Sequence, residues 1–102
     1  MIILYLTCGT DQEAKAISDA LLQAKLIVCA HRAQVDSSYW WKGKLYDEPE
    51  VLLTMQSSEE LFDAIEEQVQ KLHSYEQHVL TAVTVTIAAP GVKEWLDTNL
   101  AS

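Results

Sequence analysis

Two groups of side chains in the sequence have the chemistry to bind a metal ion. Cys29 and His31 are two positions apart, so on a β-strand both would point to the same face, roughly 7 Å apart at Cα. A thiolate and an imidazole suit Cu(I), Cu(II) or Zn(II). Two ligands do not complete a site, so a third would come from elsewhere, such as a neighbouring chain. The alternative is that Cys29 is a small core residue and that His31 lies at the surface or forms a hydrogen bond.

The second group is His73, Glu76 and His78, in a segment that we expect to join a helix to a strand. Loops of this kind often carry function, and two imidazoles with one carboxylate can hold a divalent ion and leave a position open. The alternative for His73 is a favourable interaction with the dipole at the helix C-terminus, without any ligand. We expect Tyr75, within the same segment, to lie at an interface or in a pocket wall.

The sequence contains none of the common catalytic motifs. It has no glycine-rich phosphate loop, no nucleophile elbow and no His-Glu-x-x-His. Arg32 is the only arginine, and the segment around it lacks the phosphate-cradling loop of an acylphosphatase-type enzyme. We therefore expect a protein that acts by binding, not an enzyme.

The composition is typical of one small acidic domain spanning residues 1–102. Lys and Arg number 7 against 15 Asp and Glu, the formal net charge is −8, and 49% of residues are hydrophobic. This balance argues against nucleic-acid and anionic-membrane partners, which need clustered basic residues. No secretory signal, transmembrane stretch or disulfide framework is evident. The sequence thus predicts a cytoplasmic protein.

The first part of the chain predicts a strand followed by a capped helix. The apolar run Ile2–Cys8 suits a central strand buried on both faces. Thr10 and Glu13 match a capping box, and the apolar spacing that follows predicts a helix ending near residue 25. Alternation with period two then predicts strands over residues 27–41 and 44–56, joined by a tight turn at Lys42 and Gly43. Pro49 is expected to cause a bulge or a local edge.

The remaining chain predicts a helix, a strand and a final helix. Residues 57–60 match a second capping box, and alternation over residues 78–88 predicts the last strand. Pro90 is placed to open the C-terminal helix. The expected inner faces of the two helices are Phe62, Ile65, Val69 and Leu72, and Val92, Trp95, Leu96 and Leu100. With right-handed crossovers, this order is a ferredoxin-like βαββαβ sandwich, with two helices on one face of an antiparallel sheet.

The two middle strands are too long for a single compact domain. About 13–15 residues at ~3.3 Å each give a ribbon of roughly 45 Å, whereas a 100-residue domain has a radius of gyration of only ~13 Å. The aromatic residues near its tip are Tyr39, Trp40, Trp41 and Tyr46. Aromatic side chains on an unsupported ribbon are typical of a buried subunit interface, so we expect an oligomer. The alternative is a strongly coiled hairpin that folds back on its own sheet.

Five short segments match one protein family in order and spacing. They are residues 20–29 (ALLQAKLIVC), 39–45 (YWWKGKL), 50–55 (EVLLTM), 72–76 (LHSYE) and 95–96 (WL). Together they resemble the CutA family of divalent-cation tolerance proteins, over nearly the whole chain. The chain departs from that family's pattern at Ser74, where the family has proline, and at His31, where it has asparagine.

This resemblance implies a ferredoxin-like protomer in a homotrimer, with the long hairpins pairing between subunits. It also implies a cytoplasmic bacterial or organellar protein that binds a divalent metal such as Cu(II) and acts in metal-ion homeostasis. The alternative function is a trimeric sensor that binds small ligands in clefts between subunits, near Cys29, Tyr39, His73 and Glu76. What occupies those clefts, a coordinated metal or an organic ligand, distinguishes the two functions.

Overall fold

The structure is a computed structural model that describes residues 1–101. Its elements follow the predicted order, with one short 3₁₀ turn added before the second helix. They are β1 (Ile2–Cys8), α1 (Asp11–Gln23), β2 (Cys29–Trp41), β3 (Lys44–Ser57), η1 (Glu59–Leu61), α2 (Phe62–Leu72), β4 (Leu80–Thr84) and α3 (Val92–Asn99).

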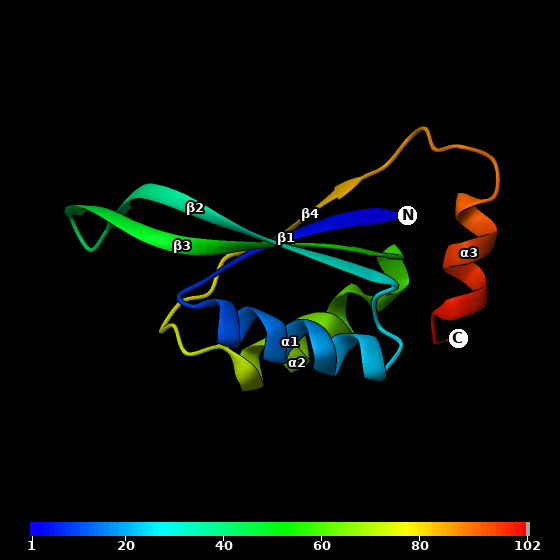
Figure 1. Ribbon diagram of the computed structural model, residues 1–102, viewed down its shortest axis with the longest axis horizontal. Coiled ribbons are helices and arrows are strands. Elements are labelled where there is room, and N and C mark those ends of the chain that lie inside the picture. The colour runs from blue at the N-terminus through cyan, green and yellow to red at the C-terminus, as the bar shows by residue number, and fades with distance from the viewer. Residues whose placement is uncertain (102) are drawn as a thin grey trace.

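The four strands form one antiparallel sheet in the order β2-β3-β1-β4. Helices α1 and α2 lie side by side across one face of this sheet, and α3 stands at the end opposite the hairpin tip (Figure 1). This is the predicted ferredoxin-like sandwich. The order places β1, the first strand of the chain, in the middle of the sheet.

The core lies between the sheet and the two helices. On β1 the even-numbered residues from Ile2 to Cys8 are buried, and they meet Ile17 and Leu21 of α1 and Ile65 of α2 in one cluster. Tyr5, on the opposite face, is 37% exposed. The prediction that β1 is buried on both faces is therefore wrong for the single chain, because the helices cover only one face of the sheet.

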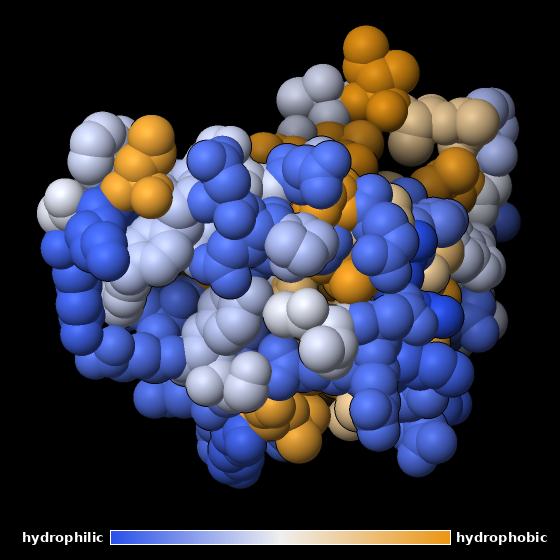
Figure 2. Space-filling model, turned by 60° about the vertical axis from the view of Figure 1, so that its left-hand side comes forward, coloured by the Kyte–Doolittle hydropathy of each residue, from blue (hydrophilic) through white to orange (hydrophobic). Residues whose placement is uncertain are grey.

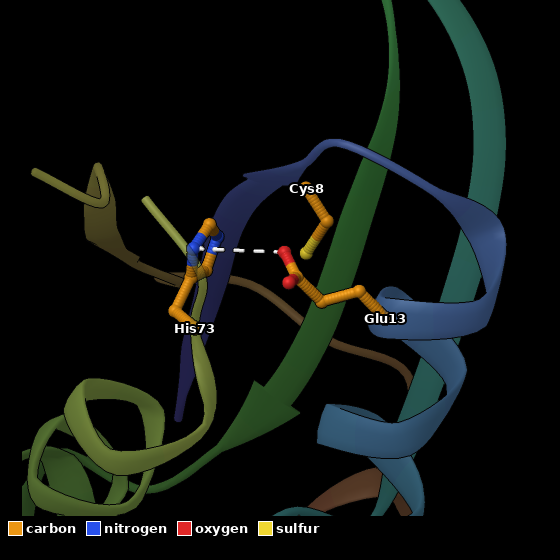
Figure 3. Close-up of side chains that lie close together, drawn as sticks. All are labelled: Cys8, Glu13 and His73. Atoms are coloured by element: carbon orange, nitrogen blue, oxygen red, sulfur yellow. Dashed lines mark ion pairs between the residues drawn. The ribbon is translucent and has the colours of Figure 1, made fainter. Parts of the chain in front are cut away.

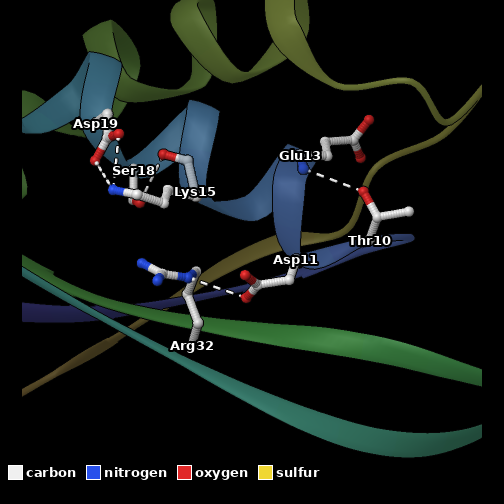
Figure 4. Close-up of polar contacts among 7 residues, drawn as sticks. All are labelled: Thr10, Asp11, Glu13, Lys15, Ser18, Asp19 and Arg32. Atoms are coloured by element: carbon white, nitrogen blue, oxygen red, sulfur yellow. Dashed lines mark hydrogen bonds and ion pairs between the residues drawn. The ribbon is translucent and has the colours of Figure 1, made fainter.

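The start of α1 is fixed by the cap that the sequence predicted. Thr10 Oγ1 accepts a hydrogen bond from the Glu13 backbone N–H at 3.1 Å (Figure 4). The Glu13 carboxylate does not complete a capping box; its Oε2 instead accepts the Ser74 N–H at 3.2 Å. Arg32 Nε lies 3.1 Å from Asp11 Oδ1, which ties β2 to the first turn of the helix. The lone arginine thus has a structural partner.

The predicted second capping box is wrong. Ser57 ends β3 with its side chain in the core, where Oγ donates to the Leu26 carbonyl at 2.6 Å. Ser58 Oγ contacts the Glu60 carboxylate at 2.6 Å and caps no backbone N–H. The chain turns through η1 before α2 begins at Phe62. A serine committed to the core cannot also cap a helix, which is why the motif misleads here.

The β2-β3 hairpin is regular along its whole length. Its register runs without interruption from Cys29 opposite Gln56 to Trp41 opposite Lys44, so the expected bulge at Pro49 is wrong. The expected local edge is confirmed, because β1 pairs with β3 only from Val51 onward. Lys42 and Gly43 form the turn with φ of 48° and 78°, the positive values that a tight two-residue hairpin turn requires.

The hairpin projects beyond the rest of the molecule. The principal extents are 44 × 27 × 21 Å, and the outer part of the ribbon has no helix beneath it (Figure 1). It does not fold back on its own sheet. Near the tip, Trp40 is 72% exposed and Leu45 is 60% exposed.

Strand β4 is shorter than the sequence pattern predicts. It pairs with β1 as far as Thr84 opposite Ile2, and the Val85 N–H then reaches the Met1 carbonyl at 3.0 Å. Beyond that point the alternating pattern continues without a strand. Ile87 is 89% exposed in consequence. Figure 2 shows hydrophobic atoms gathered at the top of the molecule, at the height of the segment between β4 and α3 in Figure 1.

The final helix packs on less of its predicted face. Leu96 is 3% exposed, whereas Trp95 is 42% exposed and Leu72 of α2, also expected to be internal, is 43% exposed. Pro90 precedes the cap residue Gly91, and α3 begins at Val92. None of the helices described is long and apolar enough to cross a membrane.

Candidate functional site

Three potential metal ligands converge where β1, α1 and the end of α2 meet. Cys8 ends β1, Glu13 lies in the first turn of α1, and His73 directly follows α2. One ligand atom from each lies within 4.8 Å of the other two, and the side chains point toward one another (Figure 3). No other such group of three is found among residues 1–101.

His73 is held by both ring nitrogens. Its side chain is fully buried, with Nε2 2.8 Å from the Thr7 carbonyl oxygen. The Tyr75 backbone N–H donates to Nδ1 at 3.1 Å. We therefore assign the proton to Nε2, which donates to Thr7 and leaves the lone pair on Nδ1. That nitrogen faces Glu13 Oε1 at 3.6 Å.

Glu13 carries the one buried polar side-chain atom without a partner among the described residues, Oε1. Its other oxygen accepts the Ser74 N–H. Buried oxygens are nearly always hydrogen-bonded, because a group left without a partner loses its hydration energy. Here Oε1 faces His73 Nδ1 at 3.6 Å, and the lone pair of that nitrogen accepts the Tyr75 N–H, so Oε1 is the atom left without a partner. A cation at this point would satisfy Oε1, and a thiolate, a carboxylate and an imidazole suit Cu(II) or Zn(II).

The Cys8 thiol is protonated at neutral pH. Burial raises its pKa from the ordinary 9.0 to about 12, and the negative charges of Glu13 and Glu50 act in the same direction. Since metals bind the thiolate, an ion entering this group would have to displace the Cys8 proton.

The remaining residues of the predicted metal sites have other contacts. Glu76 pairs with Lys42 at 3.0 Å. His78 Nε2 lies 2.9 Å from a Glu66 oxygen, and its ring stacks on His73 at 5.7 Å between centroids. Within the described residues, neither joins the group around His73.

Cys29 and His31 meet as a pair. Cys29 Sγ lies 3.8 Å from each ring nitrogen of His31, as expected for neighbours on one strand face. No third ligand joins them in the part of the chain that the structure describes. They lie on β2, the edge strand of the sheet.

A second candidate site is a cleft between the outer part of the hairpin and the segment 75–79, with a volume of about 580 Å³. Both predicted ligand-binding tyrosines, Tyr39 and Tyr75, line it, together with Trp41, Glu48, Glu50 and Glu76. Cys29 and His73, which were expected near the same cleft, are not among its lining residues.

The two tyrosines of this cleft each donate to a carboxylate. Tyr75 Oη lies 2.6 Å from Glu50 Oε2, and Glu50 is 5% exposed. Tyr39 Oη donates to Glu48 Oε1, and this hydrogen bond is the main reason that the pKa of Tyr39 rises to about 12. Burial is the main cause that raises the pKa of Tyr75, followed by its bond to Glu50. Both hydroxyls therefore remain protonated donors at neutral pH.

Two residues of the converging group were not identified from the sequence as ligands. Cys8 was interpreted as a small buried hydrophobe and Glu13 as a capping residue. The strand order could have predicted that these residues meet. Because β4 lies antiparallel beside β1, the segment that leads into β4 must pass the end of β1. That places His73 beside Cys8 and the start of α1.

Comparison with known proteins gives consistent matches over the whole fold. Residues 2–99 match the family model described as CutA1 divalent ion tolerance protein. A Thermotoga maritima protein named divalent-cation tolerance protein CutA is 30% identical over 94% of this chain and 95% of its own length. A rice protein named as a chloroplastic CutA 1 is 29% identical over 93% of this chain and 54% of its own. The crystal structure of CutA1 from Pyrococcus horikoshii superposes with a TM-score of 0.94 at 26% identity, covering all of both chains.

Proposed function

Since the chain belongs to the family of CutA1 divalent ion tolerance proteins, we propose that it binds a divalent cation such as Cu(II) and acts in metal-ion homeostasis. It acts by binding and not by catalysis. The observation that carries this proposal is the buried Glu13 Oε1 without a partner, which lies beside the Cys8 thiol and the His73 imidazole.

Cys8, Glu13 and His73 would hold the ion, in place of the His73, Glu76 and His78 set expected from the sequence. The Nε2–H of His73 donates to the Thr7 carbonyl, and this contact fixes the ring so that Nδ1 faces the carboxylate. Histidine ligands at metal sites are commonly oriented by a hydrogen bond from the ring nitrogen that does not bind the metal. The Tyr75 N–H would give up its bond to Nδ1 when the ion enters.

Calorimetric titration of the metal-free protein with Cu(II) and with Zn(II) tests this site. We expect saturable binding that His73→Ala and Glu13→Gln each weaken at least tenfold. Glu67→Gln is the matched control for Glu13→Gln, because it removes the same type of group at the surface, and it should leave the affinity unchanged. Identical titrations of wild type and His73→Ala would discard the assignment.

We further propose that the protein is a homotrimer. The support is the amount of apolar and aromatic surface that the single chain leaves uncovered on the hairpin and on the segment after β4, including Trp40 and Ile87. The interface would include Trp40, Trp41 and Tyr46. Tyr46 also stacks on Tyr39 within its own hairpin at 5.5 Å between ring centroids. This stacking would hold the Tyr46 ring in a fixed orientation at the interface.

A second candidate function is the sensing of a small organic ligand in the cleft of Tyr39 and Tyr75. The specific observation in its favour is a cavity of about 580 Å³, a size typical of small-molecule sites. Because Trp40 and Trp41 belong both to the lining of this cleft and to the interface proposed above, the cleft would lie beside the subunit boundary of a trimer. Screening small molecules of different charge by tryptophan fluorescence tests the idea, and a complete lack of saturable response would contradict it.

We propose a cytoplasmic location for this chain. The rice relative is named as a chloroplast protein, so the compartment has to be measured in the native cell. Fractionation with detection by antibody is the direct experiment, and recovery mainly outside the cytoplasmic fraction would contradict the proposal.

A further inference from the structure

We propose that the cleft lined by Tyr39, Trp41 and Tyr75 binds a small organic ammonium ion, such as a primary amine or a diamine. The inference rests on the second candidate function and names its ligand class. Cys8, Glu13 and His73 do not line the cleft, although Tyr75 both lines it and contacts the His73 ring.

The cleft carries negative charge that is largely fixed in place. Glu48, Glu50 and Glu76 line it, and its described lining includes no lysine or arginine. Tyr75 and Tyr39 donate to Glu50 and Glu48 through neutral hydroxyls, so these bonds orient the carboxylates without cancelling their charge. Each of these two carboxylates has a second oxygen that no tyrosine occupies. A cleft lined by one sign of charge concentrates ions of the opposite sign.

Aromatic rings form the other walls. Tyr39, Tyr75 and the two hairpin tryptophans Trp40 and Trp41 line the same cavity. Aromatic faces attract ammonium groups within about 6 Å of the ring centroid. Carboxylates combined with aromatic walls select a cation that also carries apolar groups, which is the chemistry of an organic ammonium ion.

The chain places an ammonium group of its own at the edge of this cleft. Lys42 Nζ lies 3.0 Å from Glu76 Oε2 and 5.5 Å from the centroid of the Trp41 ring. The Lys42 ammonium group therefore contacts a carboxylate and an aromatic ring at the same time. These are the two contacts that we propose for the ammonium group of the ligand. The Lys42 side chain is 64% exposed, so it can leave when a free amine takes its place.

A bare divalent metal fits this cleft poorly. No histidine or cysteine is among its described lining residues, and one oxygen of Glu48 and one of Glu50 already accept tyrosine hydroxyls. The volume of about 580 Å³ greatly exceeds the roughly 30 Å³ that one water molecule occupies in the liquid. An organic cation fills such a space, and its alkyl part contacts the rings.

Fluorescence titration with a charge series of equal-sized probes tests the proposal. The protein carries Trp95→Phe, so that only Trp40 and Trp41 report, and it is kept in its native oligomeric state with a chelator present. The probes are 1,4-diaminobutane, 1-butylamine, 1-butanol and butanoate. At low ionic strength we expect saturable binding of both amines, at least tenfold tighter than that of 1-butanol, and no binding of butanoate. Salt at 0.5 M should weaken amine binding severalfold, because it screens exposed charges.

Two variants and a matched control locate the effect. Glu76→Gln should weaken amine binding at least threefold. Glu67→Gln is its control, because Glu67 is equally exposed at 70% and also pairs with a lysine, but on the surface of α2; it should bind like wild type. Lys42→Gln should strengthen amine binding, because it removes the internal competitor.

The outcomes separate this inference from the functions on which it builds. Binding of 1-butanol as tight as that of the amines, or unchanged amine binding in Glu76→Gln, overturns the ammonium proposal and leaves a general ligand cleft. Absence of binding by every probe overturns both. Cu(II) titration of Glu76→Gln should match wild type, so the metal function stands or fails on its own measurement.

Discussion

His73 joins three parts of the chain through one buried ring. It contacts the Thr7 carbonyl at the end of β1, receives the Tyr75 N–H, and faces Glu13 at the start of α1. Tyr75 also packs edge-on against the ring at 4.6 Å between centroids. A residue with this many contacts contributes to folding whether or not a metal is bound.

We therefore expect His73→Ala to destabilise the metal-free protein by about 2–3 kcal/mol, because it leaves the buried Thr7 carbonyl unpaired and opens a cavity. Urea denaturation in the presence of a chelator measures the free energy of unfolding. The exposed His31 offers the comparison, since His31→Ala should cost less than about 0.5 kcal/mol. Equal stability of His73→Ala and wild type would show that the contacts of this ring contribute nothing to folding.

The Cys8 thiol predicts how stability changes in alkaline solution. Its pKa is raised from 9.0 in the unfolded chain to about 12 in the fold, so between these values the unfolded state has released a proton that the native state retains. The free energy of unfolding must then fall as pH rises above 9, by up to about 1.4 kcal/mol per pH unit. We expect Cys8→Ala to lose about 1 kcal/mol less than wild type between pH 8 and pH 10.

Denaturation at a series of pH values gives this comparison directly. Cys29→Ala is the control, because its thiol is only partly buried on the edge strand, and it should follow the wild-type curve. Parallel curves for all three proteins would contradict the buried-thiol explanation.

The sequence shows which residue types are present at the metal group but not which of them meet. His73 was identified as a potential ligand from its type and from its place after a helix. Cys8 was not, because a buried thiol at the end of an apolar strand is compatible equally with core packing. Only the distances among Cys8, Glu13 and His73 separate the two interpretations. Those distances depend on the pairing of β1 with β4, whose paired residues lie 74 (Leu6 and Leu80) to 82 (Ile2 and Thr84) positions apart along the chain.

At the scale of elements, Ser57 anchors the end of β3 to the connection between α1 and β2. Its buried Oγ donates to the Leu26 carbonyl at 2.6 Å. Ser57→Ala should therefore lower the free energy of unfolding by about 1 kcal/mol. The side chain of the adjacent Ser58 bonds only to the Glu60 carboxylate at the surface, and Ser58→Ala should change stability by less than about 0.5 kcal/mol. A reversed order of these two effects in urea melts would mean that the capping motif, and not the core hydrogen bond, matters here.

The hydrophobic periodicity of the sequence predicted which helices and strands form and in what order. It did not always predict the residue at which each of them ends. The pairing of β2 with β3 continues through Pro49 without a bulge. This proline lies just outside the segment of β3 that pairs with β1, so its missing N–H interrupts no pairing on that side. The predicted strand over residues 78–88 is limited to Leu80–Thr84, the residues that pair with β1 between Leu6 and Ile2. Alternation in the sequence records which side chains suit a sheet, but the partner strand decides where pairing stops.

At the scale of the whole molecule, the long hairpin is the feature that the sequence predicted from length alone. The structure has the expected extension, 44 Å along its longest axis. The proposed homotrimer predicts a mass of three times the 11.5 kDa of one chain, which sedimentation equilibrium at micromolar concentration measures. A protomer mass under these conditions would contradict the proposal.

Ile87→Asp should shift that assembly toward protomers. Ile87 is 89% exposed in the single chain, so the substitution costs the protomer little, whereas a charge buried at an interface without a partner is strongly unfavourable. Leu22→Asn is the control, since Leu22 is 37% exposed on α1, on the helical side of the sheet, and should leave the assembly intact. Equal masses for both variants would exclude the β4–α3 segment from the interface.

The position of β1 in the middle of the sheet has a consequence for how the chain is made. β1 is synthesised before both of its neighbours, which are residues 51–57 of β3 and 80–84 of β4. At about 5–20 residues per second of synthesis, this apolar strand waits several seconds before either neighbour exists. During that interval the chain adds α1 and β2, and of these α1 is the element that packs against β1 in the core. The pairing of the first strand is therefore completed only when the last strand has been made.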